Sequence, residues 1–245
     1  QHAVQLATRL GVDYLEARNE RPVRDDWLRK DSLYVSFRKP ITEDHEANLG
    51  AIPRKQRAMV RKGIKAGLTG ELDDGVDNLY RAYSESVRNL GTPVFPKVHF
   101  QAIRDEFGEA VDVVTVRHQG AVVASVMNYY FRDQVLPFYG GGIVEARNLA
   151  ANDFMYWEVM RRAADRGCRL FDFGRSKVDT GSYRFKKHWG FEPQPLCYEY
   201  RLVKAREMPD INPNNPKYRL FINLWKKLPV GISRMIGPWL ARGLA

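Results

Sequence analysis

The order of predicted elements between residues 110 and 203 constrains the fold more than any other feature of this sequence. Three strand patterns follow one another, joined by two-residue turns: 110–118, 121–131 and 134–142. A loop at 140–152, a helix pattern ending at Gly167 and a strand pattern at 169–173 come next. A strand that reaches a parallel neighbour through a helix does so by a right-handed crossover. The loop is therefore expected at the carboxyl edge of the sheet, where ligands bind in such folds.

Helix patterns surround these strands. Residues 53–67 have the pattern of a basic helix, and 73–91 that of a second helix with one apolar stripe, which is typical of core packing. Residues 96–108 add a third helix, and Asn152 is expected to cap the crossover helix. A short helix and a last strand at 195–203 complete the order. The sequence thus predicts an α+β (α/β) fold in which helices flank a mixed sheet.

Two stretches of the chain resemble each other. The helix and strand on either side of Gly11 match those on either side of Gly167, and LYVSFR at 33–38 matches LCYEYR at 196–201. The copies lie about 160 residues apart and favour an internal duplication, with chance similarity as the alternative. A first residue other than Met fits a truncated first copy. The expected division is a truncated first module, a complete second module, and a linker with basic amphipathic helices: 1–48, 49–203 and 204–245.

Composition limits the classes of partner and of site. The chain has 39 basic against 29 acidic residues, which favours polyanionic partners such as nucleotides, tRNA or anionic lipid. Cys168 and Cys197 have no partner at metal spacing and are interpreted as buried reduced thiols rather than a disulfide or a nucleophile, which favours a cytoplasmic location. The five histidines are scattered, so no metal site is expected. No apolar run of membrane-spanning length and no export signal is visible.

The stretch FDFGRSKVDTGSYRFKKHWG, residues 171–190, carries the densest set of polar groups. The element order resembles the GNAT fold of the N-acyltransferases. Within it, FDFGRS and GSYRFKKHWGFEP are similar to the carboxyl-terminal signature of the Fem-type (FemAB-like) aminoacyltransferases, in which Tyr-x-Phe-Lys opens a short helix. The second module and the tail are most similar to the Fem-like proteins of exosortase (PEP-CTERM) and exopolysaccharide systems.

This resemblance implies the type of reaction. Fem-type enzymes transfer an amino acid from aminoacyl-tRNA to an amine of a peptidoglycan precursor. For this chain it implies N-acyl transfer to an amine acceptor, an envelope or glycan precursor, with no tightly bound cofactor and with aminoacyl-tRNA or acyl-CoA as co-substrate. The loop lacks the Gln/Arg-x-x-Gly-x-Gly/Ala signature of acetyl-CoA enzymes. An acetyl-CoA-dependent N-acetyltransferase, or a non-catalytic module that binds a polyanionic glycan, lipid headgroup or RNA, are the alternatives.

The resemblance also implies three catalytic residues. Lys186 matches the lysine that meets negative charge on a substrate phosphate or on the developing oxyanion, with a solvated helix face as the alternative. Asp172 either accepts a proton from the acceptor or pairs with Arg175 or Arg184. Tyr183 either orients a carbonyl or packs under the site.

Substrate-binding residues are expected in two segments. Arg147 and Asn148 lie in the loop before the crossover helix, whose amino end would favour the phosphates of a donor. Arg175, Ser176 and Arg184 follow the next strand and are predicted to contact donor or acceptor.

Two basic segments complete the prediction. Six Lys or Arg and no acid occur between Arg54 and Lys65, either as a solvated helix face or as a strip that binds phosphates of tRNA or of a lipid pyrophosphate. The tail at 217–245 has a basic amphipathic pattern. It either packs on the first module or lies on the anionic inner face of a membrane.

Overall fold

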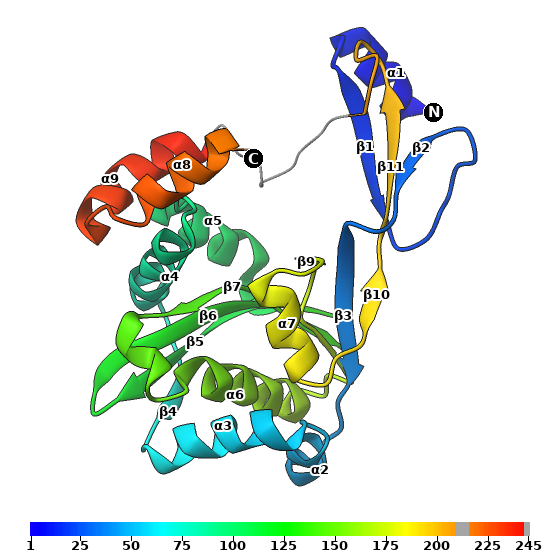
Figure 1. Ribbon diagram of the computed structural model, residues 1–245. Helices are drawn as coiled ribbons and strands as arrows, with labels where there is room; N and C mark the ends of the chain where they lie inside the picture. Colours follow the sequence, from blue (N-terminus) through cyan, green and yellow to red (C-terminus); the bar gives the residue numbers. More distant parts are fainter. Residues whose placement is uncertain (209–215, 243–245) are drawn as a thin grey trace.

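The computed structural model describes residues 1–208 and 216–242, and for residues 216–219 only the helical backbone. Its main sheet has the strand order β10-β3-β8-β7-β6-β5-β4, with β9 paired to β3 (Figure 1). The strands are β3 Tyr34–Pro40, β4 Thr69–Leu72, β5 Val111–His118, β6 Ala121–Phe131, β7 Gln134–Gly142, β8 Leu170–Asp172, β9 Ser176–Lys177 and β10 Pro193–Pro195. Pairing is antiparallel except between β7 and β8.

The central meander forms where the sequence predicted it. Gln119 and Gly120, between β5 and β6, both have positive φ, 50° and 81°, as a tight hairpin turn requires. The helix α6, Ala151–Asp165, then joins β7 to its parallel neighbour β8. The predicted mixed α+β fold is confirmed.

Helices cover both faces of this sheet, because alternate residues along each strand point to opposite sides. Val114 of β5 packs in the cluster that includes α3, Arg54–Lys65, and α6, whereas its neighbour Val113 packs with α4, Asp77–Leu90, and α5, Lys97–Phe107. The short helices α2, His45–Gly50, and α7, Gly181–His188, lie on the α6 side (Figure 1). Two single turns, η1 Gly108–Ala110 and η2 Val144–Arg147, precede β5 and α6.

A smaller sheet with the order β1-β11-β2 projects from the body, beside the helix α1, His2–Leu10 (Figure 1). Its strands are β1 Tyr14–Asn19, β2 Leu28–Lys30 and β11 Cys197–Leu202. The last predicted strand is thus β11, and it pairs with β1 and β2 rather than with the main sheet. Because β3 also pairs with β8, strand pairing crosses the boundary at 48/49, and the division into modules stays a prediction.

Two further features concern the predicted helices and cysteines. Helix α6 is preceded by Ala150 in the left-handed region, with φ 55°, and no side chain caps it, so the prediction of Asn152 as its cap is wrong. Cys168 and Cys197 are free and buried, as predicted. Helices α8, Pro216–Trp225, and α9, Val230–Ala241, lie beside α4. Within the described ranges no helix combines the length and apolar character that a membrane span requires.

Candidate active site

The strands β7 and β8 separate in the middle of the sheet. They pair only at Gln134 with Leu170 and at Val135 with Phe171, although β7 continues to Gly142. On its other side β8 stays paired with β3, where Asp172 lies opposite Arg38. The segment after β8 therefore leaves β7 beyond the first two residues of β7, and the two diverge toward the carboxyl end of that strand, the edge at which the sequence predicted a site.

Lys186 points into the protein at this place. Helix α7 begins at the cap Thr180, whose Oγ1 accepts a hydrogen bond from the backbone N–H of Tyr183. Two turns later the Lys186 side chain is buried, with 9% of the residue exposed, and its Nζ donates to the backbone oxygens of Gly174 and Arg175 at 3.1 Å each. The predicted alternative, a solvated helix face, does not apply to Lys186.

The surroundings of Lys186 lower the pKa of its ammonium group. Burial lowers its pKa from 10.5 to about 8, since the ammonium loses its hydration; Asp172 acts in the opposite direction, and Arg175 adds to the lowering. The Nζ also lies 5.6 Å from the centre of the Phe37 ring. Two of three N–H donors of the ammonium have acceptors within the described part of the chain.

Asp172 is an ion-paired carboxylate. Arg38 Nε donates to its Oδ2 at 2.7 Å, and the backbone N–H of Gly174 donates to its Oδ1 at 2.6 Å. The predicted partners Arg175 and Arg184 are wrong, because antiparallel pairing of β3 with β8 places Arg38 directly opposite Asp172. Sequence reasoning missed Arg38, since it precedes Asp172 by 134 positions and only the strand register brings the two together.

The other predicted residues after β8 have separate surroundings. Arg175 lies with its guanidinium 4.5 Å from the centre of the Tyr34 ring and donates to the hydroxyl of Tyr198. Ser176 is buried, and its Oγ has no hydrogen-bond partner in the described residues. The exposed Arg184 donates to the backbone oxygen of Asp179 at 3.1 Å.

Tyr183 is half-buried and packs by its ring. The Tyr183 ring packs edge-on against the Phe37 ring, with 5.5 Å between the ring centres. The Nζ of Lys187 lies 5.7 Å from the centre of the Tyr183 ring. Tyr183 and Lys186 therefore both border Phe37, one through its ring and the other through its ammonium.

The loop before α6 is held by close backbone packing. A Cβ on Gly141 would lie 2.3 Å from the Cβ of Ser86 in α4, which explains a glycine there. The backbone N–H of Val144 donates to Glu85 Oε1 at 3.0 Å. Arg147 and Asn148 are exposed, and in residues 1–208 and 216–242 their side chains make no hydrogen bond or ion pair with the residues around Lys186. The structure therefore brings Asp172 and Arg175 close to Lys186, whereas no bond in the described residues links Arg147 or Asn148 to them.

A buried carboxylate that the sequence did not reveal joins three helices behind the site. Asp153, in the first turn of α6, accepts hydrogen bonds from Trp189 Nε1 at 3.1 Å and from Gln56 Nε2 of α3. Burial raises its pKa. No local pattern predicts this contact, because its partners lie 36 and 97 positions away in sequence.

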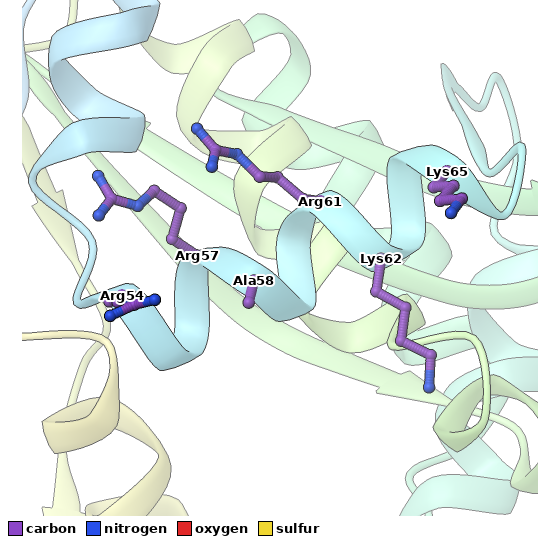
Figure 2. Close-up of a pocket in the computed structure, with 6 residues that line it drawn as sticks. All are labelled: Arg54, Arg57, Ala58, Arg61, Lys62 and Lys65. Atoms are coloured by element: carbon purple, nitrogen blue, oxygen red, sulfur yellow. The ribbon is translucent and has the colours of Figure 1, made fainter.

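Helix α3 presents a basic strip to the surface, which we define as Arg54, Arg57, Arg61, Lys62 and Lys65. These residues line an open depression of about 480 Å³ together with Ala58 (Figure 2). Among their side chains only Arg57 makes a hydrogen bond in the described residues, to the backbone oxygen of Gly50 at 3.1 Å. The opposite side of α3 packs on α6 through Gln56, Val60 and Gly63, so the charged side is not needed for the core.

Residues 54–187 match the family model of the acetyltransferase (GNAT) domain, which is more than half of the 245 residues. This chain belongs to the GNAT acetyltransferase family. The matched GNAT region contains the basic strip, the meander, α6 and the part of α7 that ends one residue after Lys186. No curated protein matches the chain in sequence.

Solved structures extend the comparison to the whole fold. FemX is similar with a TM-score of 0.64 and 16% identity, over 90% of this chain and 70% of FemX. The C-terminal domain of a protein described as a lysylphosphatidylglycerol synthetase from Agrobacterium fabrum has a TM-score of 0.52 and 14% identity, over 71% of this chain and 61% of that one. L-PGS from Bacillus licheniformis has a TM-score of 0.50 and 12% identity, over 97% and 70%. At these identities the likeness establishes the fold.

Proposed function

We propose that this protein is a Fem-like N-acyltransferase that transfers an acyl or aminoacyl group to an amine acceptor in bacterial cell-envelope or exopolysaccharide assembly, on the cytoplasmic side. The observation that carries the proposal is the buried ammonium of Lys186 beside the segment that leaves β8. Membership of the GNAT family and the fold shared with FemX support the reaction class. The exosortase association rests on the sequence resemblance alone.

The chemistry needs no nucleophile from the protein. The lone pair of the acceptor amine attacks the donor carbonyl, the C–N bond of an amide forms, and the C–O bond of an ester or the C–S bond of a thioester breaks. The proton lost by the amine goes to the departing alkoxide or thiolate. The remaining N–H of Lys186 would stabilise the negative oxygen of the intermediate, since a fixed charge in a poorly hydrated site costs no reorganisation during the reaction.

Asp172 and its neighbours fit a positioning role in this scheme. Both carboxylate oxygens of Asp172 already accept hydrogen bonds, from Arg38 and from the backbone of Gly174. Asp172 would therefore position these groups rather than accept the proton of the acceptor amine. Tyr183 and Phe37 would form the wall beside the ammonium. Arg175, Ser176 and Arg184 would contact acceptor or donor from the segment after β8.

For the donor we propose a phosphate-bearing co-substrate, aminoacyl-tRNA or acyl-CoA. The uncapped amino end of α6, with Arg147 and Asn148 before it, would favour its phosphates. The basic strip of α3 would contact further phosphates of a tRNA, and such contacts weaken steeply with salt. Micromolar binding of acetyl-CoA would favour acyl-CoA, whereas salt-sensitive binding of charged tRNA would favour aminoacyl-tRNA.

The decisive test is acyl transfer by Lys186→Ala, with Lys186→Arg and the exposed Lys187→Ala as matched controls. The expected loss for Lys186→Ala is 10-fold or more in turnover, which corresponds to more than about 1.4 kcal/mol of transition-state stabilisation. Lys187→Ala should keep wild-type turnover. Equal turnover of Lys186→Ala and wild type, in folded protein, would contradict the proposed role.

One observation favours a second candidate function, a non-catalytic module that binds a polyanionic glycan, lipid headgroup or RNA. Lys186 and Asp172 are both engaged by the protein itself, as in a purely structural network. The basic strip would then be the functional surface. Salt-sensitive binding of a polyanion without turnover of either donor class would support this candidate.

A further inference from the structure

The carboxyl-terminal helices α8 and α9 expose an unusual concentration of large apolar side chains. The exposed fraction is 65% for Leu220, 59% for Leu224, 73% for Met235 and 72% for Trp239. We call these four residues the outer face. Contiguous exposed apolar side chains mark interaction sites in folded proteins.

The inner sides of both helices are already used for packing. Trp225 of α8 is buried, and its Nε1 donates to the backbone oxygen of Thr92 at 3.1 Å. In α9 a Cβ on the buried Gly237 would lie 3.1 Å from the backbone N of Val94. The hairpin is thus held on α4 and the segment after it, with a defined inner and outer side.

Helical geometry places the outer face opposite the packed side. On α9, Met235 and Trp239 each follow a buried residue by two positions, which is about 200° around the helix. On α8, Leu220 and Leu224 have the same offset from Ile222, whose side chain packs on Gly91. Docking on the body therefore leaves these apolar side chains exposed.

The charged residues of the hairpin itself have one sign. Lys226 and Lys227, in the turn between the helices, and Arg242 at the end of α9 are exposed. The sequence from Leu220 to Arg242 has four basic residues and no acid. An apolar face with an exposed Trp, edged by Lys and Arg, matches the interface of an anionic bilayer, where rings and aliphatic chains enter the headgroup region and cations meet lipid phosphates. A second copy of this face would bring like charges together, which disfavours self-association.

We infer that α8 and α9 form a membrane-docking hairpin, which inserts Trp239, Met235 and Leu224 into the headgroup boundary of an anionic bilayer while α4 keeps it fixed to the body. This function does not depend on acyl transfer. It is measured without donor or acceptor, so its failure and a failure of the proposed reaction are separate results.

Tryptophan fluorescence gives a direct readout of insertion. Four of the five tryptophans are at most 8% exposed: Trp27, Trp157, Trp189 and Trp225. Trp239 is therefore the residue whose emission should move to shorter wavelength when vesicles are added. The probes are the full chain with vesicles of phosphatidylglycerol and phosphatidylcholine, and with vesicles of phosphatidylcholine alone. Brominated phosphatidylcholine in the anionic vesicles should quench the shifted emission, and Trp239→Phe should abolish the shift.

Paired variants test the apolar and the charged contributions by vesicle co-sedimentation. Met235→Ser with Trp239→Ser should weaken partition by about 10-fold or more, since two largely exposed apolar side chains lose their burial in the bilayer. Lys226→Glu with Lys227→Glu should weaken it by a similar factor at low salt. The matched controls are Leu10→Ser on α1, where Leu10 is 64% exposed, and Arg9→Glu with Arg21→Glu, two exposed cations outside both the hairpin and the basic strip.

Several results would overturn the inference. The inference fails if the protein does not sediment with anionic vesicles, or if Arg9→Glu with Arg21→Glu weakens sedimentation as much as Lys226→Glu with Lys227→Glu. It also fails if lipid-borne bromine does not quench the shifted Trp239 emission. A concentration-dependent dimer in sedimentation equilibrium that Met235→Ser with Trp239→Ser dissolves would assign the outer face to a second copy instead. Because every changed side chain is exposed, circular dichroism should show unchanged folding in all variants.

Discussion

Burial of the Lys186 ammonium should be visible in the pH dependence of stability. Its pKa is about 8 in the folded protein against 10.5 for the ordinary side chain. Below pH 8 the folded protein therefore holds a charge that water solvates better, and this penalty is relieved as pH rises, because the unfolded chain then binds more protons than the folded one. With 1.36 kcal/mol for each pKa unit, wild type should gain about 2 kcal/mol between pH 8 and pH 10 relative to a variant with no titrating group at this position.

The assay is urea unfolding of wild type and Lys186→Met at pH 7, 8, 9 and 10. Methionine has a similar length and no charge, so all other titrations cancel in the difference between the two proteins. The difference in the free energy of unfolding between wild type and Lys186→Met should rise by about 2 kcal/mol from pH 8 to pH 10. A constant difference for Lys186 would refute the reasoning, because its pKa would then be the same in folded and unfolded chains.

Three further predictions concern the supports of the site. Arg38→Ala should lower the free energy of unfolding by about 1–3 kcal/mol, because the Asp172 carboxylate loses its charged partner in a largely buried place; Arg38→Lys should lose less, as chemical denaturation would show. Gly141→Ala should destabilise by about 1–3 kcal/mol through the clash with Ser86, and Ser86→Gly in the same chain should restore most of it, as measured by thermal unfolding. Burial raises the pKa of Asp153 above 3.8, so the folded protein keeps this proton after the unfolded chain has lost it. Wild type should therefore lose stability relative to Asp153→Asn as pH rises above about 4 in urea titrations, and an unchanged difference would contradict the assignment.

The order of elements from the meander through the crossover helix to β8 was predictable from sequence, whereas β4 and β10 of the main sheet were not predicted. The meander strands are long and apolar, Gly120 in the first turn suits positive φ, and Gly167 follows the crossover helix, so local signals agree with the fold. The strand β2 has three residues and β9 two, too few for any periodic pattern. Their positions depend on pairing with distant strands, which local signals do not contain.

The residues of the candidate site were predictable only where they lie close together in sequence. Lys186 and Asp172 lie on one continuous stretch of sequence; Asp172 ends β8, and Lys186 of α7 donates to the backbone oxygen of Gly174 just after it. Arg38 and Asp153 reach the same region through strand register and helix packing. The prediction that Asp172 pairs with Arg175 or Arg184 was wrong because it relied on nearness in sequence. The guanidinium groups of Arg175 and Arg184 contact other groups, and Arg38 pairs with Asp172 instead.

The orientation of Lys186 could have been decided from spacing. It precedes the fully buried Trp189 by three positions and so lies on the same side of α7, whereas Lys187 is turned by about 100° toward solvent. A lysine at a core position carries a desolvation cost that leucine or methionine would not have. The charge must therefore contribute something that apolar packing cannot: bonds to the backbone oxygens of Gly174 and Arg175, stabilisation of a bound acyl group, or both. Lys186→Met separates these contributions, because the first appears in unfolding and the second appears only in transfer.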